Sequence, residues 1–299
     1  MIKQFSEGNE RFPVYVLQTV ALLRDKSTKS WELLKLEPEN FEADWKSACQ
    51  AIESALKKIT SMRDGYGVIS NKWLPYVTMV PVLAYLPQRL EAMFDKLKCI
   101  EKIDSWYWSS IITHAYSGST DTQIALDSRQ WLEWFDDDNK VPETVQEGRD
   151  ELRSLNLRQV NRMSDAIYKG VMCLVALRGG RDFRKVNMIE FSTLDDHHIF
   201  PQSRASEFTI GNQINAIGNK TLIDKETNQN YIRDSKPSEY LRRIIRQEGI
   251  TEQQMRERLE THLITSKAFD ALLSDDFETF ISERENTIKE MLSLFISKP

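Results

Sequence analysis

The chain is poor in cysteine and histidine and has no excess of positive charge. Only three cysteines and four histidines occur in 299 residues, and the formal net charge is −5. The cysteines lie far apart without a Cys-x-x-Cys pair, which excludes a zinc ribbon and indicates reduced, buried thiols of a cytoplasmic protein. The negative charge excludes a basic coat for nucleic acid, so any contact with DNA must come from a local patch of Lys and Arg.

A secretory signal and long apolar runs are also lacking. The first residues have no apolar signal core, and the wholly apolar run at 171–177 is far too short to span a bilayer. We therefore expect a cytoplasmic protein without membrane association. The hydrophobic content of 40% and the seven tryptophans indicate a folded globular chain of two domains or one large domain.

Apolar residues recur at steps of three and four over most of the chain, which predicts amphipathic helices. In the first 135 residues such stripes cover 41–59, 82–97 and 120–135, with Asn40 and Thr120 as candidate N-caps. Residues 1–135 are thus predicted to form an all-helical domain. Four tryptophans have the helical spacing and apolar neighbours of core residues, which we favour over stacking on bases: Trp106, Trp108, Trp131 and Trp134.

The polar, acidic residues 136–150, with one Pro and one Gly, are the predicted linker to a second domain at 151–299. Helix is expected to resume at 160–177 and to end at Gly179 and Gly180. Further helices are predicted after Pro237, after a capping box of Thr251 and Gln254, and after Ser274 as N-cap.

Between these helices the hydrophobic period changes near residue 187. Residues 187–191 and 198–200 have the pattern of short strands, the second ended by Pro201, and residues 220–224 are another strand candidate. The predicted fold class is therefore mainly α, with a helical domain and a small ββα element embedded in helices at about 190–241.

Two of the four histidines, His197 and His198, are adjacent in the stretch Asp-Asp-His-His-Ile-Phe-Pro-Gln-Ser at 195–203. An imidazole pair fills a core poorly but can hold a metal beside a general base. Neighbours on an extended segment point to opposite sides, so one imidazole can face a metal and the other a water molecule if the strand end is twisted. Asn219 follows 21 positions after His198, and Asn228 follows nine later. This order and spacing outline an HNH nuclease site.

The segment 195–241 resembles the HNH, or ββα-metal, nucleases. It resembles more closely the nuclease domain at the C-terminal end of GmrSD-type, modification-dependent (Type IV) restriction endonucleases. The resemblance rests on residues 196–203, 217–223, 237–241 and Asn228, and residues 106–110 and 116–118 also look like the helical region of those proteins. It implies a metal-dependent DNA endonuclease of a restriction or anti-phage system, acting on phage DNA that carries modifications.

The resemblance also implies roles for particular residues. His198 would be the general base, and His197 a metal ligand. Asn228 would be the second ligand, supplied by a helix, with Asn230 as the alternative. Asn219 would belong to the site by tying the loop between the strands to the backbone. Asp196 would be a ligand or a partner that orients His197.

Basic residues in and after this segment are candidates for contacts with the DNA backbone: Arg204, Lys220, Arg242, Arg243 and Arg246. The alternative for the last three is a solvated helix face paired with glutamates. The other histidines, His114 and His262, are expected to be helix residues without a catalytic role.

The implied cofactor is one divalent ion, Mg²⁺ or Mn²⁺, with Ni²⁺ also acceptable. GmrSD-type proteins begin with a nucleotide-dependent domain, but this chain has no Gly-x-x-x-x-Gly-Lys loop, so we assign it no nucleotide cofactor. We expect a C-terminal fragment, or a subunit whose partner carries the nucleotide-dependent function, and a homodimer stays open. Two alternatives remain: a helical interaction or DNA-binding module with an inactive HNH site, and the same chemistry on RNA.

Overall fold

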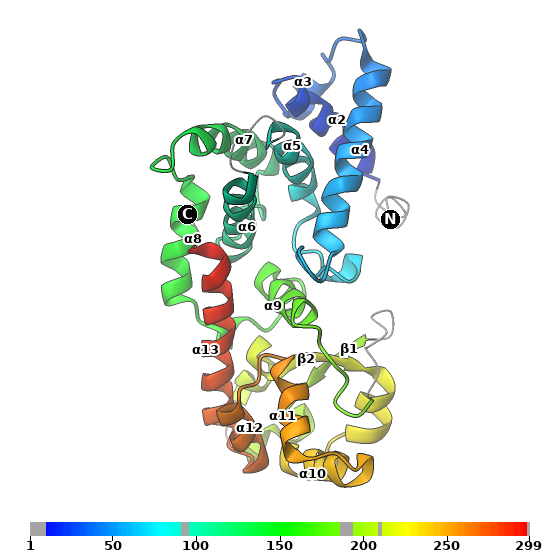
Figure 1. Cartoon of the computed structure of the whole chain (residues 1–299), viewed down its shortest axis with the longest axis vertical. Helices are drawn as coiled ribbons and strands as arrows, with labels where there is room; N and C mark the ends of the chain where they lie inside the picture. The colour runs from blue at the N-terminus through cyan, green and yellow to red at the C-terminus, as the bar shows by residue number, and fades with distance from the viewer. Residues whose placement is uncertain (1–9, 91–95, 186–193, 209–210, 298–299) are drawn as a thin grey trace. The chain divides into compact units, whose positions relative to one another are not determined.

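The computed structural model describes residues 10–90, 96–185, 194–208 and 211–297, and it is mainly helical, as predicted (Figure 1). The chain divides into two compact units. The first comprises residues 1–65, 74–154 and 293–299, and the second comprises residues 66–73 and 155–292. In the described ranges no helix is both long enough and apolar enough to cross a membrane.

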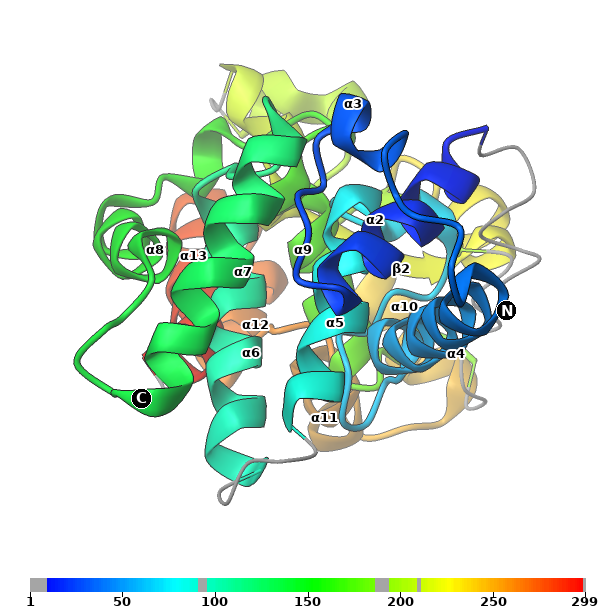
Figure 2. The same ribbon diagram turned by 90° about the horizontal axis from the view of Figure 1, so that it is seen from above.

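The first unit is built from helices. Their bounds are α2 (Phe12–Leu23), α3 (Ser30–Leu33), α4 (Phe41–Thr60), the 3₁₀ turn η2 (Val77–Met79), α5 (Val80–Leu90), α6 (Lys96–Ile112), α7 (Thr120–Asp136) and α8 (Glu143–Ser154). Helix α4 packs against α2 and α5, and α6 packs against α8 (Figure 1 and Figure 2).

Four tryptophans of this unit lie in its core, which confirms the prediction. Trp106, Trp108, Trp131 and Trp134 are fully buried. Trp131 packs edge-on against Trp106, with 5.6 Å between ring centroids, and lies 5.3 Å from the ring of Trp134. Because no part of these side chains is exposed, they cannot stack on bases in this conformation.

A buried carboxylate organises the same core. Asp127 of α7 accepts hydrogen bonds from Trp106 Nε1 at 3.0 Å and Tyr116 OH at 2.6 Å. It also accepts from Gln123 Nε2 at 2.9 Å and Thr144 Oγ1 at 3.2 Å. Burial raises the pKa of Asp127, and the four donors oppose that rise. One acidic side chain thus joins α6, α7 and α8.

The prediction of a linker at 136–150 is wrong in its second half, where α8 begins at Glu143. Its buried side includes Thr144 and Val145, while most of its charged residues are exposed. Gly148 lets α8 approach α6 closely, because a Cβ added there would fall 2.5 Å from the side chain of Ser109 in α6. The polar composition therefore belongs to a surface helix, and the second unit begins after Ser154.

One of the three predicted N-caps is confirmed in position. Asn40 is the N-cap residue of α4, with a positive φ of 55° and no capping hydrogen bond from its side chain, whereas Thr120 lies inside α7. Ser274 follows the preceding helix, and Asp276 instead accepts from Thr279 N in the first turn of the last helix. The predicted helices are present, but several residues near the start of each helix could act as its N-cap. The part of the predicted 82–97 helix at 91–95 lies outside the described residues.

The second unit contains the strands. Its elements are η1 (Asn71–Trp73), η3 (Leu157–Gln159), α9 (Ala166–Leu177), β1 (Leu194–His198), η5 (Gln202–Glu207), η6 (Gly211–Asn215), η7 (Ile217–Asn219), β2 (Lys220–Asp224), the π-helical turn η8 (Thr227–Ile232), α10 (Pro237–Glu248), α11 (Glu252–Glu260), α12 (Ser266–Leu273) and most of α13 (Phe277–Ile296). Helix α9 packs against β2 (Figure 1).

Several local predictions are confirmed in this unit. β2 covers the expected residues 220–224, α10 begins at Pro237, and Thr251 and Gln254 form the capping box of α11. Gly179 follows the end of α9 with a φ of 72°, a conformation that glycine adopts readily.

Two boundaries in the second unit differ from the prediction. Helix α9 starts at Ala166 because Asp165 caps it, and the carbonyl of Val160 instead accepts from Ile217 N at 2.7 Å. Of the strand expected at 198–200, only His198 lies in a strand, because β1 ends at that residue. The candidate strand at 187–191 lies outside the described residues.

Candidate metal-binding and catalytic site

The antiparallel pair β1–β2 sorts the site residues onto two faces. His197 lies opposite Thr221, and His198 lies opposite Lys220. Because side chains alternate along a strand, Asp196 and His198 share one face with Lys220, and His197 shares the other face with Thr221. The adjacent histidines therefore enter different surroundings.

His197 meets Asn228, the residue that the resemblance implies as its partner. Nδ1 of His197 lies 2.7 Å from Oδ1 of Asn228, which comes from the π-helical turn η8 rather than a longer helix. The imidazole is 3% exposed, and among the described residues its Nε2 has no hydrogen-bond partner. Burial lowers the pKa of His197 to about 3, so the ring is neutral at physiological pH.

The structure also separates the two candidate asparagines. Asn228 is half-buried and lines the pocket at His197, whereas Asn230 is exposed and is not among the lining residues. Two positions within one turn differ in this way because successive residues of a helix point in different directions. Asn228 is therefore the residue placed to act together with His197.

His198 has polar partners at both ring nitrogens. Nε2 lies 2.9 Å from Oδ1 of Asn215, and Nδ1 lies 3.3 Å from Nζ of Lys220. Since an ammonium group can only donate, Nδ1 carries the lone pair and Nε2 donates its proton to Asn215. Burial, and then the charge of Lys220, lowers the pKa of His198, which favours the neutral imidazole.

Asp196 is engaged on the face of His198. Its carboxylate accepts a hydrogen bond from the hydroxyl of Tyr168 in α9 and lies 3.6 Å from Nζ of Lys220. The strand directs it away from the His197–Asn228 pair, although it lines the same pocket. This geometry fits a partner of Lys220 better than a metal ligand.

Asn219 makes three backbone hydrogen bonds from a fully buried position. Its Oδ1 accepts from Phe200 N at 2.9 Å, and its Nδ2 donates to the carbonyls of Phe200 at 3.0 Å and Ile214 at 2.9 Å. These bonds hold the chain that leaves β1 against the chain that enters β2. Asn219 thus acts on the site only through the backbone.

Four of the predicted site residues line one pocket of about 450 Å³. Its lining residues are Asp196, His197, His198, Pro201, Gln202, Ser203, Asn228, Arg233 and Asp234. Within the described ranges, no three His, Cys, Asp or Glu side chains gather in a way that could hold a metal ion. A metal site here would therefore use the His197–Asn228 pair and leave the other coordination positions to water and substrate oxygens.

The chemistry of this pair fits such an ion. Two neutral acceptor atoms 2.7 Å apart repel each other unless a proton or a cation lies between their lone pairs. With a cation there, the imidazole proton would move to Nε2, and the imidazole ring lies 6.1 and 6.2 Å, between centroids, from the rings of Phe183 and Tyr240. An imidazole and an amide oxygen without a carboxylate suit Mn²⁺ or Ni²⁺ better than Mg²⁺.

The candidate DNA contacts differ in their availability. Lys220 is 8% exposed and lies against His198, so it is not placed on the surface. Arg204 forms an ion pair with Glu207. Nη2 of Arg242 donates to the Leu273 carbonyl at 3.1 Å, and Nη2 of Arg243 donates to the Tyr231 carbonyl at 2.8 Å. Arg246 is exposed on α10.

Other functional neighbours of the site gave no signal in the sequence. Asn215 contacts His198 and Tyr168 contacts Asp196, but neither belongs to the motif, and Arg233 lines the pocket with an unusual backbone conformation. Arg284 of α13 is fully buried, and its Nη1 donates to the carbonyls of Gly218 at 2.8 Å and Lys220 at 2.7 Å. Burial lowers the pKa of Arg284 to about 9.

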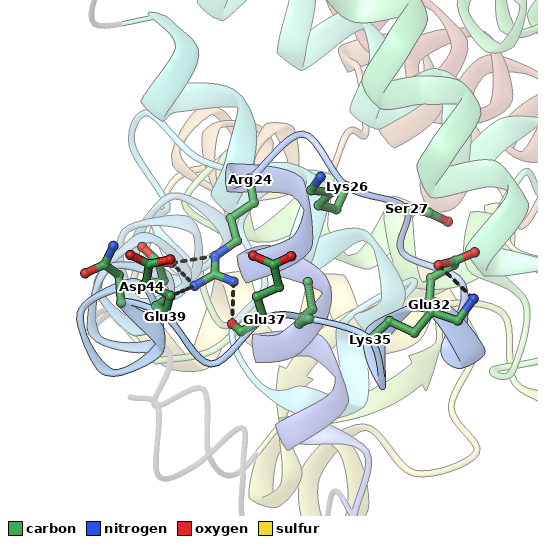
Figure 3. A pocket seen from close by; sticks show the side chains of 10 residues that line it. Arg24, Lys26, Ser27, Glu32, Lys35, Glu37, Glu39 and Asp44 are labelled. Carbon is green, nitrogen blue, oxygen red and sulfur yellow. Dashed lines mark hydrogen bonds and ion pairs between the residues drawn. The ribbon is translucent and has the colours of Figure 1, made fainter.

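A second pocket, of about 540 Å³, lies in the first unit among α2, α3 and α4 (Figure 3). Its charged side chains mostly satisfy one another. Arg24 donates to Asp44 at 2.6 Å and to the carbonyls of Glu37 and Glu39 at 2.8 and 2.6 Å. No histidine or cysteine lines it, and nothing there suggests catalysis.

Comparison with known proteins gives one relative and no family. No model of a known protein family matches the chain. The chain is 29% identical to the uncharacterized protein MJ0686 of Methanocaldococcus jannaschii, over an alignment of 322 positions that covers 99% of this chain and 54% of that protein. The chain thus spans about half the length of this relative.

Proposed function

We propose that the chain is a metal-dependent HNH endonuclease that hydrolyses phosphodiester bonds of DNA, within a restriction or anti-phage system. The observation that supports it most is the meeting of His197 and Asn228 at one pocket with His198, on two antiparallel strands followed by a short helical turn. This is the arrangement that the resemblance to ββα-metal nucleases implies for the ββα element at about 190–241.

In this proposal His198 is the general base. Asn215 holds the Nε2 proton, which leaves the Nδ1 lone pair to accept a proton from water. Lys220 competes weakly for that lone pair, because 3.3 Å is long for a hydrogen bond. A divalent ion at His197 Nδ1 and Asn228 Oδ1 would neutralise the phosphate and stabilise the leaving oxygen. Asn219 keeps the strand ends in register.

The proposal is tested by plasmid cleavage with the purified chain in Mn²⁺, Mg²⁺, Ni²⁺ or EDTA. We expect metal-dependent nicking that is lost in His198→Ala and Asn228→Ala. Asn230→Ala is the matched control, because it removes the same amide from an exposed position two residues away. Cleavage by His198→Ala at the parent's rate would refute the assignment of the base. A labelled RNA of the same sequence tests the alternative polymer.

A second candidate function is a helical interaction or DNA-binding module with an inert site. The net charge of −5 and the engagement of Lys220, Arg204 and Arg243 within the chain favour its interaction form, because they leave few cations free for DNA. Titration with Mn²⁺ separates the two candidates, since an inert site binds no ion at His197. The main proposal also includes a nucleotide-dependent domain or partner subunit, and a homodimer. The greater length of the archaeal relative leaves room for such a domain.

A further inference from the structure

A segment without a predicted role, residues 181–185, is fixed to the end of α11. The carbonyl of Arg181 accepts a hydrogen bond from His262 Nε2. Nη1 of Arg258 donates to the carbonyl of Phe183 at 3.2 Å and to that of Arg184 at 2.9 Å. The backbone of the 181–185 segment is therefore held at both ends by buried side chains.

Within this segment, Asp182 accepts hydrogen bonds from the turn at 224–228, which carries Asn228. Its Oδ2 accepts from Asp224 N at 2.9 Å, and its Oδ1 accepts from Thr227 Oγ1 at 2.8 Å. Oδ1 also accepts from two backbone amides of the 181–185 segment at 2.9 Å. Asp224 ends β2 and Thr227 directly precedes Asn228, so one carboxylate that is 1% exposed spans the whole turn.

The neighbouring side chain contacts the other member of the pair. The ring of Phe183 lies against His197 at 6.1 Å between centroids, with the ring planes at 86°. The 181–185 segment thus contacts His197 through Phe183 and the turn of Asn228 through Asp182. A change of rotamer in His197 or in Asn228 would break the 2.7 Å approach between His197 Nδ1 and Asn228 Oδ1.

We propose that Asp182 is a positioning residue: it holds the turn at 224–228 so that Asn228 Oδ1 stays at His197 Nδ1, ready to share a divalent cation. The cation rests on the proposed function, whereas the geometric claim does not. Two of the four hydrogen bonds to this buried carboxylate come from the turn and two come from the 181–185 segment, so Asp182 ties the turn to that segment. Such supporting partners orient ligand side chains in metal sites.

The first experiment measures the imidazole ¹⁵N shifts of His197 in the metal-free full chain. In the parent, Nδ1 should have the shift of a hydrogen-bonded nitrogen, and Asp182→Ala should lose that shift. Thr227→Val removes one donor to Asp182 without changing the side-chain volume, and it should move the shift in the same direction by less. If Asp182→Ala does not fold, Thr227→Val alone tests the positioning role of Asp182.

The matched control is Thr144→Val, which removes an equivalent hydroxyl donor to the buried Asp127 of the first unit. We expect it to lower stability while leaving the His197 shifts unchanged. If Asp182→Ala and Thr227→Val are folded and keep the parent's His197 shifts, Asp182 is only a structural carboxylate and the inference is overturned.

The second experiment adds Mn²⁺ and follows the paramagnetic broadening of the His197 signals. The Mn²⁺ concentration for half-broadening should rise about 10- to 100-fold in Asp182→Ala and stay at the parent's value in Thr144→Val. Equal values in parent and Asp182→Ala would refute the positioning role. If Mn²⁺ broadens no His197 signal in the parent, the proposed metal chemistry fails, and the metal-free shifts still decide the role of Asp182.

Discussion

Acid should destabilise the second unit through His262, a buried histidine outside the candidate ligand pair. Its Nδ1 accepts from Thr221 Oγ1 at 2.7 Å, and its Nε2 donates to the carbonyl of Arg181. Burial lowers the pKa of His262 to about 3, against an ordinary value of 6.5. Between these values the unfolded chain binds a proton that the folded chain does not. The stability present above pH 6.5 is therefore lost as the pH falls through that window.

The size of the loss follows from this pKa difference. At pH 5.0, protonation of an unfolded histidine with an ordinary pKa stabilises the unfolded chain by about 2 kcal/mol, and at pH 7.5 by less than about 0.1 kcal/mol. Urea unfolding at both pH values, followed by circular dichroism in EDTA, measures the loss in the parent and in His262→Gln. Gln retains a donor for the Arg181 carbonyl but does not titrate. Other titrating groups cancel between the two chains, so the parent should lose about 2 kcal/mol more than the variant.

Thr221→Val is the control, because it removes the partner of His262 but not the titrating ring. It should be less stable than the parent at pH 7.5 and still lose stability on acidification. Equal losses in the parent and in His262→Gln would mean that His262 is not held neutral by burial, and would refute the reasoning.

Three substitutions test other features of the fold. Arg233 has a φ of 51° and a ψ of −127°, a region that suits glycine, so Arg233→Gly should raise the free energy of unfolding by about 1 kcal/mol; a lower melting temperature would contradict this. Asp127→Ala leaves four buried donors without their acceptor and should cost about 3–5 kcal/mol in urea unfolding, and a loss below about 1 kcal/mol would argue against the network. Gly148→Ala should cost about 1–3 kcal/mol by pushing α8 from Ser109, and Ser109→Gly in the same chain should recover only part of it, because the Cα of residue 109 would still lie 2.8 Å from the added Cβ.

The helices and the second strand could be predicted because their signals act within one turn or one strand. The capping box of Thr251 and Gln254 and the position of β2 needed only local sequence. The linker prediction failed for the opposite reason. The contact between Gly148 and Ser109 is tertiary, and composition alone cannot tell a solvated helix from a loop.

The central residues of the candidate site could be identified in the sequence, but the residues that hold them in place could not. The resemblance to ββα-metal nucleases implied that His197 and Asn228 would meet, and they do. Asn215 and Tyr168 reach the site only because the chain folds back on itself. Nothing in the residues around Asp182 marks it as the carboxylate that holds that turn.

The alternation of one strand explains how adjacent histidines can have different roles. On one face His197 is enclosed by rings and made neutral by burial, which suits a ligand for a cation. On the other face His198 lies among Lys220 and Asn215, where one nitrogen is held and the other keeps a lone pair. A register shift of one residue in β1 would exchange the two rings and place the ammonium group of Lys220 beside the ligand position, where it would repel a cation. The hydrogen bonds of Asn219, together with those of Arg284 to the carbonyls on either side of it, oppose that shift and so preserve the difference between the histidines.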